Sequence, residues 1–445
     1  MLRGFLILIN LFLHSFLIAQ SYPRYYFRNP MGFPMQLTAN FGELRSTHWH
    51  MGLDIRTNQK VNQPVYAVAD GFISGVKIEP LGFGKSIFID HPNGMTTVYA
   101  HLNDFFPALE QYVTEQQYQQ ETWEIELQFP KDKFRVFKSQ LIAYSGNTGA
   151  SQGPHLHFEI RDTKTGKSLN PLLFGFPLSD NVPPEILKLA LYDRSRSVYD
   201  QEPQLYSLKK TKDSYTIPHV PIINTGLNKI SFAIQAIDRV TGSRNPNGIY
   251  SAKIYFDEKP LIAFELDSLD YSESSYINAQ IDYKHRAGGG TYLQHLSVLP
   301  GDRGVVYKKI NGDGSIILDD SAIHAILIEV TDAYNNTSLA SFNIQYFDSL
   351  YIPVPADAEI SKLVPNKQNV LKKNDFELEM PAECLYDTVQ LQYSRSVSSE
   401  PFALSSMHIV NDPTLPVHGN FTVRIKPDLE ISDSWKNKVL VRPRD

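Results

Sequence analysis

Cysteine is almost absent from this 445-residue chain, whose only thiol is Cys384. One thiol cannot form an intramolecular disulfide, so the fold must be held by its hydrophobic cores. Long apolar runs are also scarce. Beyond residues 1–20, no stretch reaches the roughly 20 consecutive apolar residues that a membrane-spanning helix needs. We therefore expect no membrane span once the leading segment is removed.

An excess of positive charge is missing as well. Lys plus Arg number 42 and Asp plus Glu number 48, which gives a net charge of −6. Proteins that grip the phosphate backbone present a basic patch or stripe, and this composition offers none. The sequence therefore predicts no nucleic-acid partner. An HExxH helix, a GxSxG nucleophile elbow and a complete phosphate-binding loop are also lacking.

The first twenty residues differ from the rest of the chain. Met1 to Arg3 supply a short positive region, and an almost wholly apolar run from Gly4 to Ile18 is followed by Ala19-Gln20. This order is typical of a secretory signal peptide. The run is shorter than the roughly 20 residues of a membrane anchor, and no cysteine near the cleavage site could carry a lipid. We expect residues 1–20 to be removed and the protein to be exported, to the periplasm or outside the cell.

Short strands separated by turns dominate the remaining sequence, whose length suits about three domains. A proline pair at Pro183-Pro184 and a second proline-rich break near residues 351–355 are natural linkers. The sequence therefore predicts a mainly β protein. We expect a β-rich domain over residues 24–182, an immunoglobulin-like β-sandwich over 183–349 and a second small β-sandwich over 350–445.

Two turns of the first predicted sandwich resemble each other. The segments QAIDRVTGSRNPNGIYSA and EVTDAYNNTSLASF each leave a strand through an aspartate, Asp238 or Asp332, and enter the next strand after Asn-rich or Gly-rich residues. This likeness weakly indicates related hairpins rather than a periodic repeat.

Five histidine and aspartate positions carry the chemistry: His50 and Asp54 in HWHMGLD, His101 in VYAHL, and His155 and His157 in GPHLHFEI. Imidazole and carboxylate groups bind zinc, and a catalytic zinc needs three protein ligands and one open position. Because side chains alternate along a strand, His155, His157 and Glu159 share one face and leave Leu156, Phe158 and Ile160 to the core. By the same rule His101 shares a face with Thr97 and Tyr99 and can point into a groove.

A single histidine on a strand is more often structural than a ligand, but these motifs occur together. HxxxD with an inner glycine, the YAHL strand, and GNTG followed by GPHLHFE resemble the LytM or lysostaphin-type zinc metallopeptidases of family M23. NFGELR, just before His48, fits as well. The resemblance covers roughly residues 33–172 and implies that this part is an antiparallel β-sheet zinc peptidase domain, which precedes the two predicted sandwiches.

The resemblance also implies a role for each of the five residues. His50, Asp54 and His157 would bind one zinc ion per chain, and His101 and His155 would stay off the metal and serve catalysis. Without an HExxH glutamate, a histidine must take the proton from water or stabilise the oxyanion. The sequence leaves open which of His101 and His155 does which.

Other residues near the motifs are weaker candidates. Glu159 could orient a ligand imidazole or be an exposed carboxylate at the strand end. His48 lies two residues before His50, but the spacing to Asp54 favours His50. Asn40 is assigned to a turn rather than to the open zinc position, and His91 to the hairpin turn of IDHPNG.

A long polar segment from Asn103 to Phe134 follows His101, where the resemblance implies a brief connection. The stretch from Glu110 to Glu121 is rich in Glu and Gln, which predicts a partly helical surface insertion, although a disordered loop also fits. At the rim of the expected groove it could be a lid, an inhibitory plug, a partner-binding arm or neutral decoration.

The function implied is a zinc metalloendopeptidase that hydrolyses the peptide cross-links of bacterial peptidoglycan. Two alternatives stay open: a non-hydrolytic regulator of cell-wall hydrolases, and a peptidase acting on a glycine-rich protein. The expected partners are peptidoglycan peptides and, through the C-terminal sandwiches, a cell-envelope protein.

Overall fold

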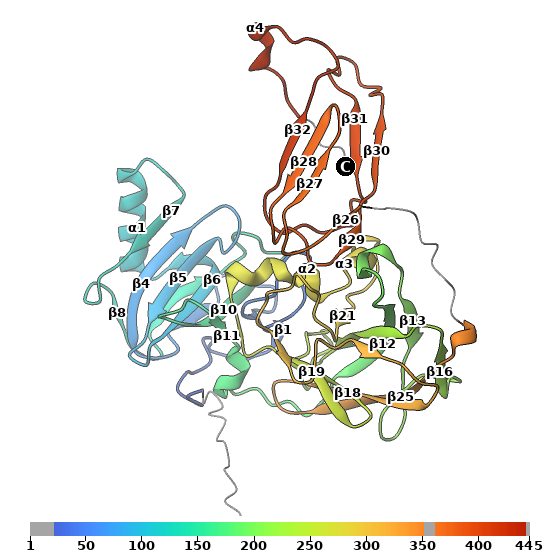
Figure 1. Ribbon diagram of the computed structural model, residues 1–445. Coiled ribbons are helices and arrows are strands. Elements are labelled where there is room, and N and C mark those ends of the chain that lie inside the picture. Colours follow the sequence, from blue (N-terminus) through green and yellow to red (C-terminus); the bar gives the residue numbers. More distant parts are fainter. Residues whose placement is uncertain (1–21, 351–360, 442–445) are drawn as a thin grey trace, which may run out of the picture.

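The computed structural model describes residues 22–350 and 361–441, which form three β-rich parts in sequence order (Figure 1). The expected signal peptide over residues 1–20 lies outside the described residues. Within the described ranges, no helix is long and apolar enough to cross a membrane. The predicted mainly β fold with antiparallel sheets is confirmed. The immunoglobulin-like assignment and the exact domain limits stay predictions.

The first domain is built on a twelve-stranded sheet, whose main strand order is β1-β2-β10-β6-β5-β4-β7. On one face of β10, Leu156, Phe158 and Ile160 are 0% exposed. The strands are β1 (Leu37–Ala39), β2 (Leu53–Arg56), β3 (Pro64–Tyr66), β4 (Gly71–Ile78), β5 (Lys85–Asp90), β6 (Met95–Phe105), β7 (Ile125–Gln128), β8 (Arg135–Val136), β9 (Leu141–Ser145), β10 (His155–Asp162), β11 (Ser168–Leu169) and β20 (Ser268–Leu269).

The segment over residues 103–134 is partly helical, as predicted, but it is not a loose surface insertion. Helix α1 (Pro107–Gln119) begins with a proline, which suits the first helical turn, and Glu110 accepts a hydrogen bond from the backbone N–H of Phe105. Leu109 and Val113, four residues apart, are buried against the sheet. Strand β7 then pairs with β4 and forms the edge of the sheet. The segment therefore belongs to the core of the first domain.

The second part is a sandwich of two facing sheets. Phe232 of one sheet and Phe342 of the other lie 5.3 Å apart between their ring centroids. The apolar residues that alternate with them are also buried: Ile230, Ile234, Ala340 and Ile344. The five-stranded sheet consists of β12 (Glu185–Asp193), β13 (Gln204–Ser207), β17 (Lys229–Ile237), β21 (Gln294–His295) and β23 (Ile316–Ile317). The eight-stranded sheet consists of β14 (Lys209–Lys210), β15 (Tyr215–Thr216), β16 (Ile222–Thr225), β18 (Ser251–Phe256), β19 (Lys259–Glu265), β22 (Tyr307–Lys309), β24 (Ile323–Thr331) and β25 (Thr337–Tyr346).

Three small sheets form the C-terminal part, drawn in red in Figure 1. Its buried residues Leu378 and Tyr386 share one hydrophobic cluster with Tyr192 and Leu299 of the sandwich. Its elements are β26 (Lys362–Leu363), β27 (Asn369–Lys372), β28 (Phe376–Met380), β29 (Val389–Gln390), β30 (Tyr393–Ser396), β31 (Met407–Val410), β32 (Thr422–Ile425) and α4 (Asp433–Lys436). The other helical segments are η1 (Pro171–Phe174), η2 (Val198–Asp200), η3 (Tyr271–Tyr276), α2 (Ile277–Gln280), α3 (Tyr283–Ala287) and η4 (Asp348–Leu350).

The sandwich also contributes directly to the first domain. Strand β20 pairs antiparallel with β11 and so extends the first sheet. Eleven residues after Leu269, the buried Gln280 side chain accepts a hydrogen bond of 3.1 Å from the indole N–H of Trp49. The segment from β20 to α2 therefore lies against the domain that carries the predicted site.

Candidate metal centre

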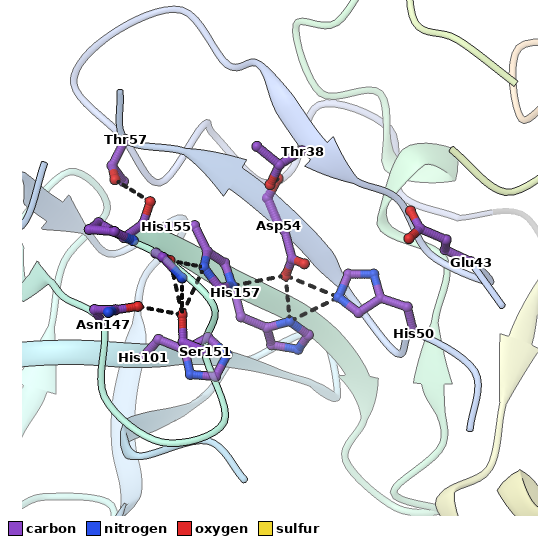
Figure 2. A network of polar contacts seen from close by, with 12 residues as sticks. Thr38, Glu43, His50, Asp54, Thr57, His101, Asn147, Ser151, His155 and His157 are labelled. Carbon is purple, nitrogen blue, oxygen red and sulfur yellow. Dashed lines mark hydrogen bonds and ion pairs between the residues drawn. The ribbon is translucent and has the colours of Figure 1, made fainter. Parts of the chain in front are cut away.

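Three side chains from two strands and the loop before them converge on one point, as Figure 2 shows. His50 Nε2 lies 3.0 Å from Asp54 Oδ1, His157 Nδ1 lies 2.9 Å from the same oxygen, and the two nitrogens are 3.1 Å apart. Asp54 and His157 stand directly opposite each other on β2 and β10. The structure thus brings together the three residues that the resemblance implied as ligands.

The hydrogen bonds of the two imidazoles leave the converging nitrogens free. His50 donates its Nδ1–H to the backbone carbonyl of Asn40 at 2.6 Å, and His157 donates its Nε2–H to Glu159 at 2.9 Å. Each ring therefore turns a lone pair toward Asp54. Fixing the tautomer through the second nitrogen is the usual arrangement around metal-bound histidine.

This donor set fits zinc. Zinc binds nitrogen and carboxylate oxygen at about 2.0–2.2 Å, so tetrahedral ligands lie about 3.3 Å apart, close to the 2.9–3.1 Å seen here. Two lone pairs and a carboxylate oxygen facing one another repel unless a cation or a proton stands between them. All three residues are buried or nearly so, with 7% exposure for His50 and 6% for His157.

A glycine makes this close packing possible. A Cβ atom on Gly52 would lie 2.5 Å from the carbonyl oxygen of Phe158 and 2.9 Å from Nε2 of His157. Gly52, the inner glycine of HxxxD, is thus required because the loop lies too close to β10 for any side chain at this position. A larger residue at this position would push the His157 ring out of place.

His101 and His155 lie beside the triad, with ring centroids 4.7 Å apart. His101 donates its Nδ1–H to the carbonyl of Thr148 at 2.8 Å, and His155 donates its own to Gly153 at 2.8 Å. Both therefore keep Nε2 free, and that of His155 lies 3.4 Å from Asp54 Oδ1. Neither residue belongs to the converging triad, in keeping with the roles that the resemblance implied, which stay predictions.

Electrostatics separates these groups further. Burial, then the neighbouring His157 and His155, lowers the pKa of His101 to about 4, so its ring is neutral at neutral pH. Burial alone would raise the pKa of Asp54. The neighbouring His50, and after it the close imidazoles of His155 and His157, instead hold the pKa of Asp54 well below its usual range.

His101 lies on the site face, but it does not share that face with Tyr99 as simple alternation predicted. Tyr99 stands opposite Phe158 on β6 and β10, so it shares the core face, whereas Ala100 stands opposite His157. Simple alternation would send His101 into the core with Tyr99. A left-handed backbone at His101 (φ 59°) and a bulge just after it turn the side chain to the other face. Such a conformation costs about 1–3 kcal/mol in a non-glycine residue and is typical of functional positions.

Glu159 is not an exposed carboxylate at the strand end, because it is 0% exposed. Besides His157 it accepts hydrogen bonds from Arg161 Nε at 2.7 Å and from the hydroxyl of Tyr271. Burial would raise the pKa of Glu159, but the Arg161 charge and the His157 hydrogen bond outweigh it and lower the pKa to about 2. A charged carboxylate therefore orients His157.

Sequence reasoning missed two residues of this network, Arg161 and Tyr271. The Arg161 guanidinium lies 4.9 Å from the ring centre of Tyr271 and 5.7 Å from that of Phe83. Tyr271 belongs to η3 of the sandwich, 112 residues after Glu159. Arg161 could have been found by continuing the alternation of β10, but no local signal marks Tyr271.

The remaining candidates lie around the triad. His48 is exposed and outside it. His91 is buried in the hairpin, where it contacts Asp70 and Thr97. The Asn40 side chain binds Gly248 of the sandwich rather than the open metal position. Arg45, in the NFGELR segment, lies 3.5 Å from Asp54 Oδ2 and was not singled out beforehand.

A pocket of about 310 Å³ opens on the site face of the sheet. Phe83, whose ring lies 5.6 Å from that of His157, and Arg161 line it near the triad. Glu126 and Gln128 of β7 line it at the edge of the sheet. The segment over 103–134 thus supplies one wall of a pocket next to the metal centre.

Comparison with known proteins agrees with this geometry. Residues 48–118 and 126–171 match the profile of peptidase family M23. Over these residues the first domain is similar to this family. The match takes in most of the segment 103–134. Residues 361–444 match the profile of the Zu5-like domain.

Individual relatives cover only part of the chain. DD-carboxypeptidase/endopeptidase Mpg of Neisseria meningitidis serogroup B is 32% identical over 134 residues, which are 30% of this chain and 24% of that protein. Peptidoglycan DD-endopeptidase ShyA of Vibrio cholerae is 26% identical over 187 residues, 41% of this chain and 36% of that protein. Among solved structures, a zinc containing peptidase from Vibrio cholerae is 26% identical, covers 33% of this chain and 38% of that chain, and has a TM-score of 0.22. This chain therefore spans less than two fifths of the length of each.

Proposed function

We propose that this protein is an exported zinc metalloendopeptidase of the bacterial cell envelope that hydrolyses peptide cross-links of peptidoglycan. The observation that carries the proposal is the convergence of His50, Asp54 and His157 with both ring lone pairs free. The name of the Neisseria relative supports an endopeptidase activity, and that of the Vibrio relative supports a peptidoglycan substrate and hence a cell-envelope location.

Zinc bound by these three residues would supply a Lewis acid that lowers the pKa of bound water to about 7 and polarises the scissile carbonyl. His101 and His155 stand beside the triad with Nε2 free, so each can accept a proton from water or donate a hydrogen bond to the developing oxyanion. Which ring does which stays open. Glu159 holds His157 in the orientation that keeps Nδ1 available.

The pocket beside the triad supports an extended peptide substrate. Its lining combines Lys77, Glu126 and Arg161 with the rings of Phe83 and Phe88, so it offers both charges and apolar surface to a peptide that carries charged and methyl groups. We propose that β7 extends the substrate groove. This use favours a groove wall over a plug for residues 103–134.

The two rival functions would give different reaction products. A non-hydrolytic regulator would not need a complete donor triad with free lone pairs, which argues against it. A peptidase acting on a glycine-rich protein would use the same chemistry and is separated only by substrate. The C-terminal sandwiches are proposed to bind a cell-envelope protein.

The test is incubation of the purified full chain with peptidoglycan, with and without a chelator, followed by identification of new amino termini. We expect cleaved cross-links that disappear with the chelator or with His157→Ala. His48→Ala is the matched control, since it removes an exposed imidazole two residues from His50 and should leave the products unchanged. Intact peptidoglycan with cleavage of a glycine-rich protein would favour the second rival, and no new amine on either substrate would favour the regulator.

A further inference from the structure

A second group of converging carboxylates lies at the end of the sandwich next to the first domain. Asp180 precedes the proline pair of the linker, Asp238 directly follows β17, and Asp332 directly follows β24. One oxygen of each lies within 4.8 Å of the others. Asp238 and Asp332 are the two aspartates of the similar turns in the sequence, and they are only 4% and 2% exposed.

The protein leaves this group without a counter-charge. None of the three carboxylates forms an ion pair with any part of the chain that the structure describes, and Arg239, the neighbouring cation, pairs with Glu185 instead. Asp180 Oδ2 and Asp238 Oδ1 also lack a hydrogen-bond partner within the described ranges. Buried carboxylates in such surroundings need a cation or a proton.

Asn247 supplies an independent sign of a missing ligand. It stands opposite Asp238 in an antiparallel bridge in which each residue donates its backbone N–H to the other's carbonyl, at 3.0 and 2.8 Å. Directly opposed residues point their side chains to the same face, so the carboxamide lies beside the Asp238 carboxylate. Asn247 is only 3% exposed, and both of its side-chain polar atoms lack a partner within the described chain. Buried polar groups are rarely left this way.

We propose that Asp180, Asp238 and Asp332, together with the carboxamide oxygen of Asn247, bind one calcium ion. Calcium takes six to eight oxygen ligands at about 2.3–2.6 Å, so oxygens on opposite sides of one ion lie up to about 4.6–5.2 Å apart, which accommodates this group. The donor set is entirely oxygen and differs from the imidazole-rich triad that suits zinc. Backbone carbonyls or water complete the coordination.

The ion has a definite place in the architecture. It joins the linker to two strand ends of the sandwich, and Asn247 precedes Gly248, whose backbone N–H and carbonyl are both bound by the Asn40 side chain at 2.9 and 2.8 Å. The carbonyl of Asn40 in turn accepts the hydrogen bond from His50. Calcium therefore fixes the hairpin that supports a zinc ligand and sets the first domain against the sandwich.

A shared proton is the alternative to a cation. Burial, then Asp332 and Asp180, raises the pKa of Asp238 to about 7, so the group could instead hold a proton near neutral pH. The two possibilities differ in calcium uptake and are separable by experiment.

The test is equilibrium dialysis of the zinc-loaded full chain, freed of calcium, against calcium up to about 10 mM, well above the weakest dissociation constants of extracellular calcium modules. We expect one calcium per chain and a higher melting temperature. Asp238→Asn and Asp332→Asn should weaken calcium binding at least tenfold. If those variants misfold, Asp180→Asn tests the same site at its less buried carboxylate. Asp319→Asn, an exposed carboxyl of the same sandwich, should change nothing.

His157→Ala separates this inference from the proposed peptidase function, since it should lose zinc and still bind one calcium. No calcium uptake by the folded wild-type chain, or equal uptake by the wild type and the Asp238→Asn and Asp180→Asn variants, would overturn the proposal.

Discussion

Replacing Glu159 with glutamine tests how the buried carboxylate prepares the metal centre. The change keeps the size of the side chain but removes its charge, and it places an amide N–H₂ among three donors: His157 Nε2–H, Arg161 Nε–H and the Tyr271 hydroxyl. At least one donor therefore loses its acceptor. Loss of such a partner of a metal ligand typically weakens metal binding 10- to 100-fold, or about 1.4–2.7 kcal/mol.

The assay is competition for zinc with a chromophoric chelator, together with hydrolysis rates at limiting and at saturating zinc. Because Glu159 acts through His157, we expect the activity to fall at limiting zinc and to recover largely when zinc is in excess. Tyr271→Phe, which removes only one of the three donors, should have a smaller effect, and Glu124→Gln, an exposed carboxyl before β7, should have none. Wild-type zinc affinity in Glu159→Gln would refute the reasoning.

Three further outcomes are expected. His101→Ala should keep its zinc but lose on the order of a hundredfold in rate, whereas His157→Ala should lose both zinc and activity. Metal analysis and an activity assay on the same samples check this. Zinc loss in His101→Ala with zinc retained in His157→Ala would contradict the assigned roles. Replacing residues 109–133 by a short Gly-Ser bridge should lower the melting temperature measured by circular dichroism, because it unpairs β4 and uncovers the apolar surface under α1; an unchanged melting curve would contradict this. Without calcium, the free energy of unfolding should fall as the pH rises from about 4 to about 7. In this range native Asp238, which faces Asp180, Asp332 and Arg239, holds a proton that the unfolded chain has released. Denaturation curves of Asp238→Asn should show a weaker dependence of stability on pH.

The site could be predicted from sequence wherever regular strand geometry decides it. The alternation of β10 correctly separated His155, His157 and Glu159 from the three core residues between and after them, because a period of two holds along any unbroken strand. The role of Glu159 was left undecided, since alternation predicts the face of the strand on which a side chain lies but not which residues cover that face.

The same rule failed at His101, where the backbone departs from it. Histidine, like asparagine, adopts the left-handed conformation more often than most residues, but its presence alone did not indicate that conformation at His101. The conformation instead depends on a tertiary contact, the hydrogen bond from His101 to the carbonyl of Thr148, 47 residues away.

Contacts between domains were the least predictable. Tyr271 reaches Glu159 across 112 residues, and Asp180 meets Asp238 and Asp332 only after the linker has folded back on the sandwich. The two similar turns were visible in the sequence, but nothing local indicated that their aspartates meet a third. Residues after Pro183-Pro184 therefore contribute to the surroundings of the metal centre.

The strand pair β11 and β20 has a consequence for the time course of folding. Ser168 and Leu169 pair with β10 on one side and with Ser268 and Leu269 on the other, so the second side of β11 stays unpaired until about a hundred more residues have been synthesised, roughly 5–20 seconds at the usual rate of translation. During that interval Trp49 also lacks Gln280. The first domain thus completes this strand pair and the Trp49 contact only after more than half of the sandwich has been synthesised.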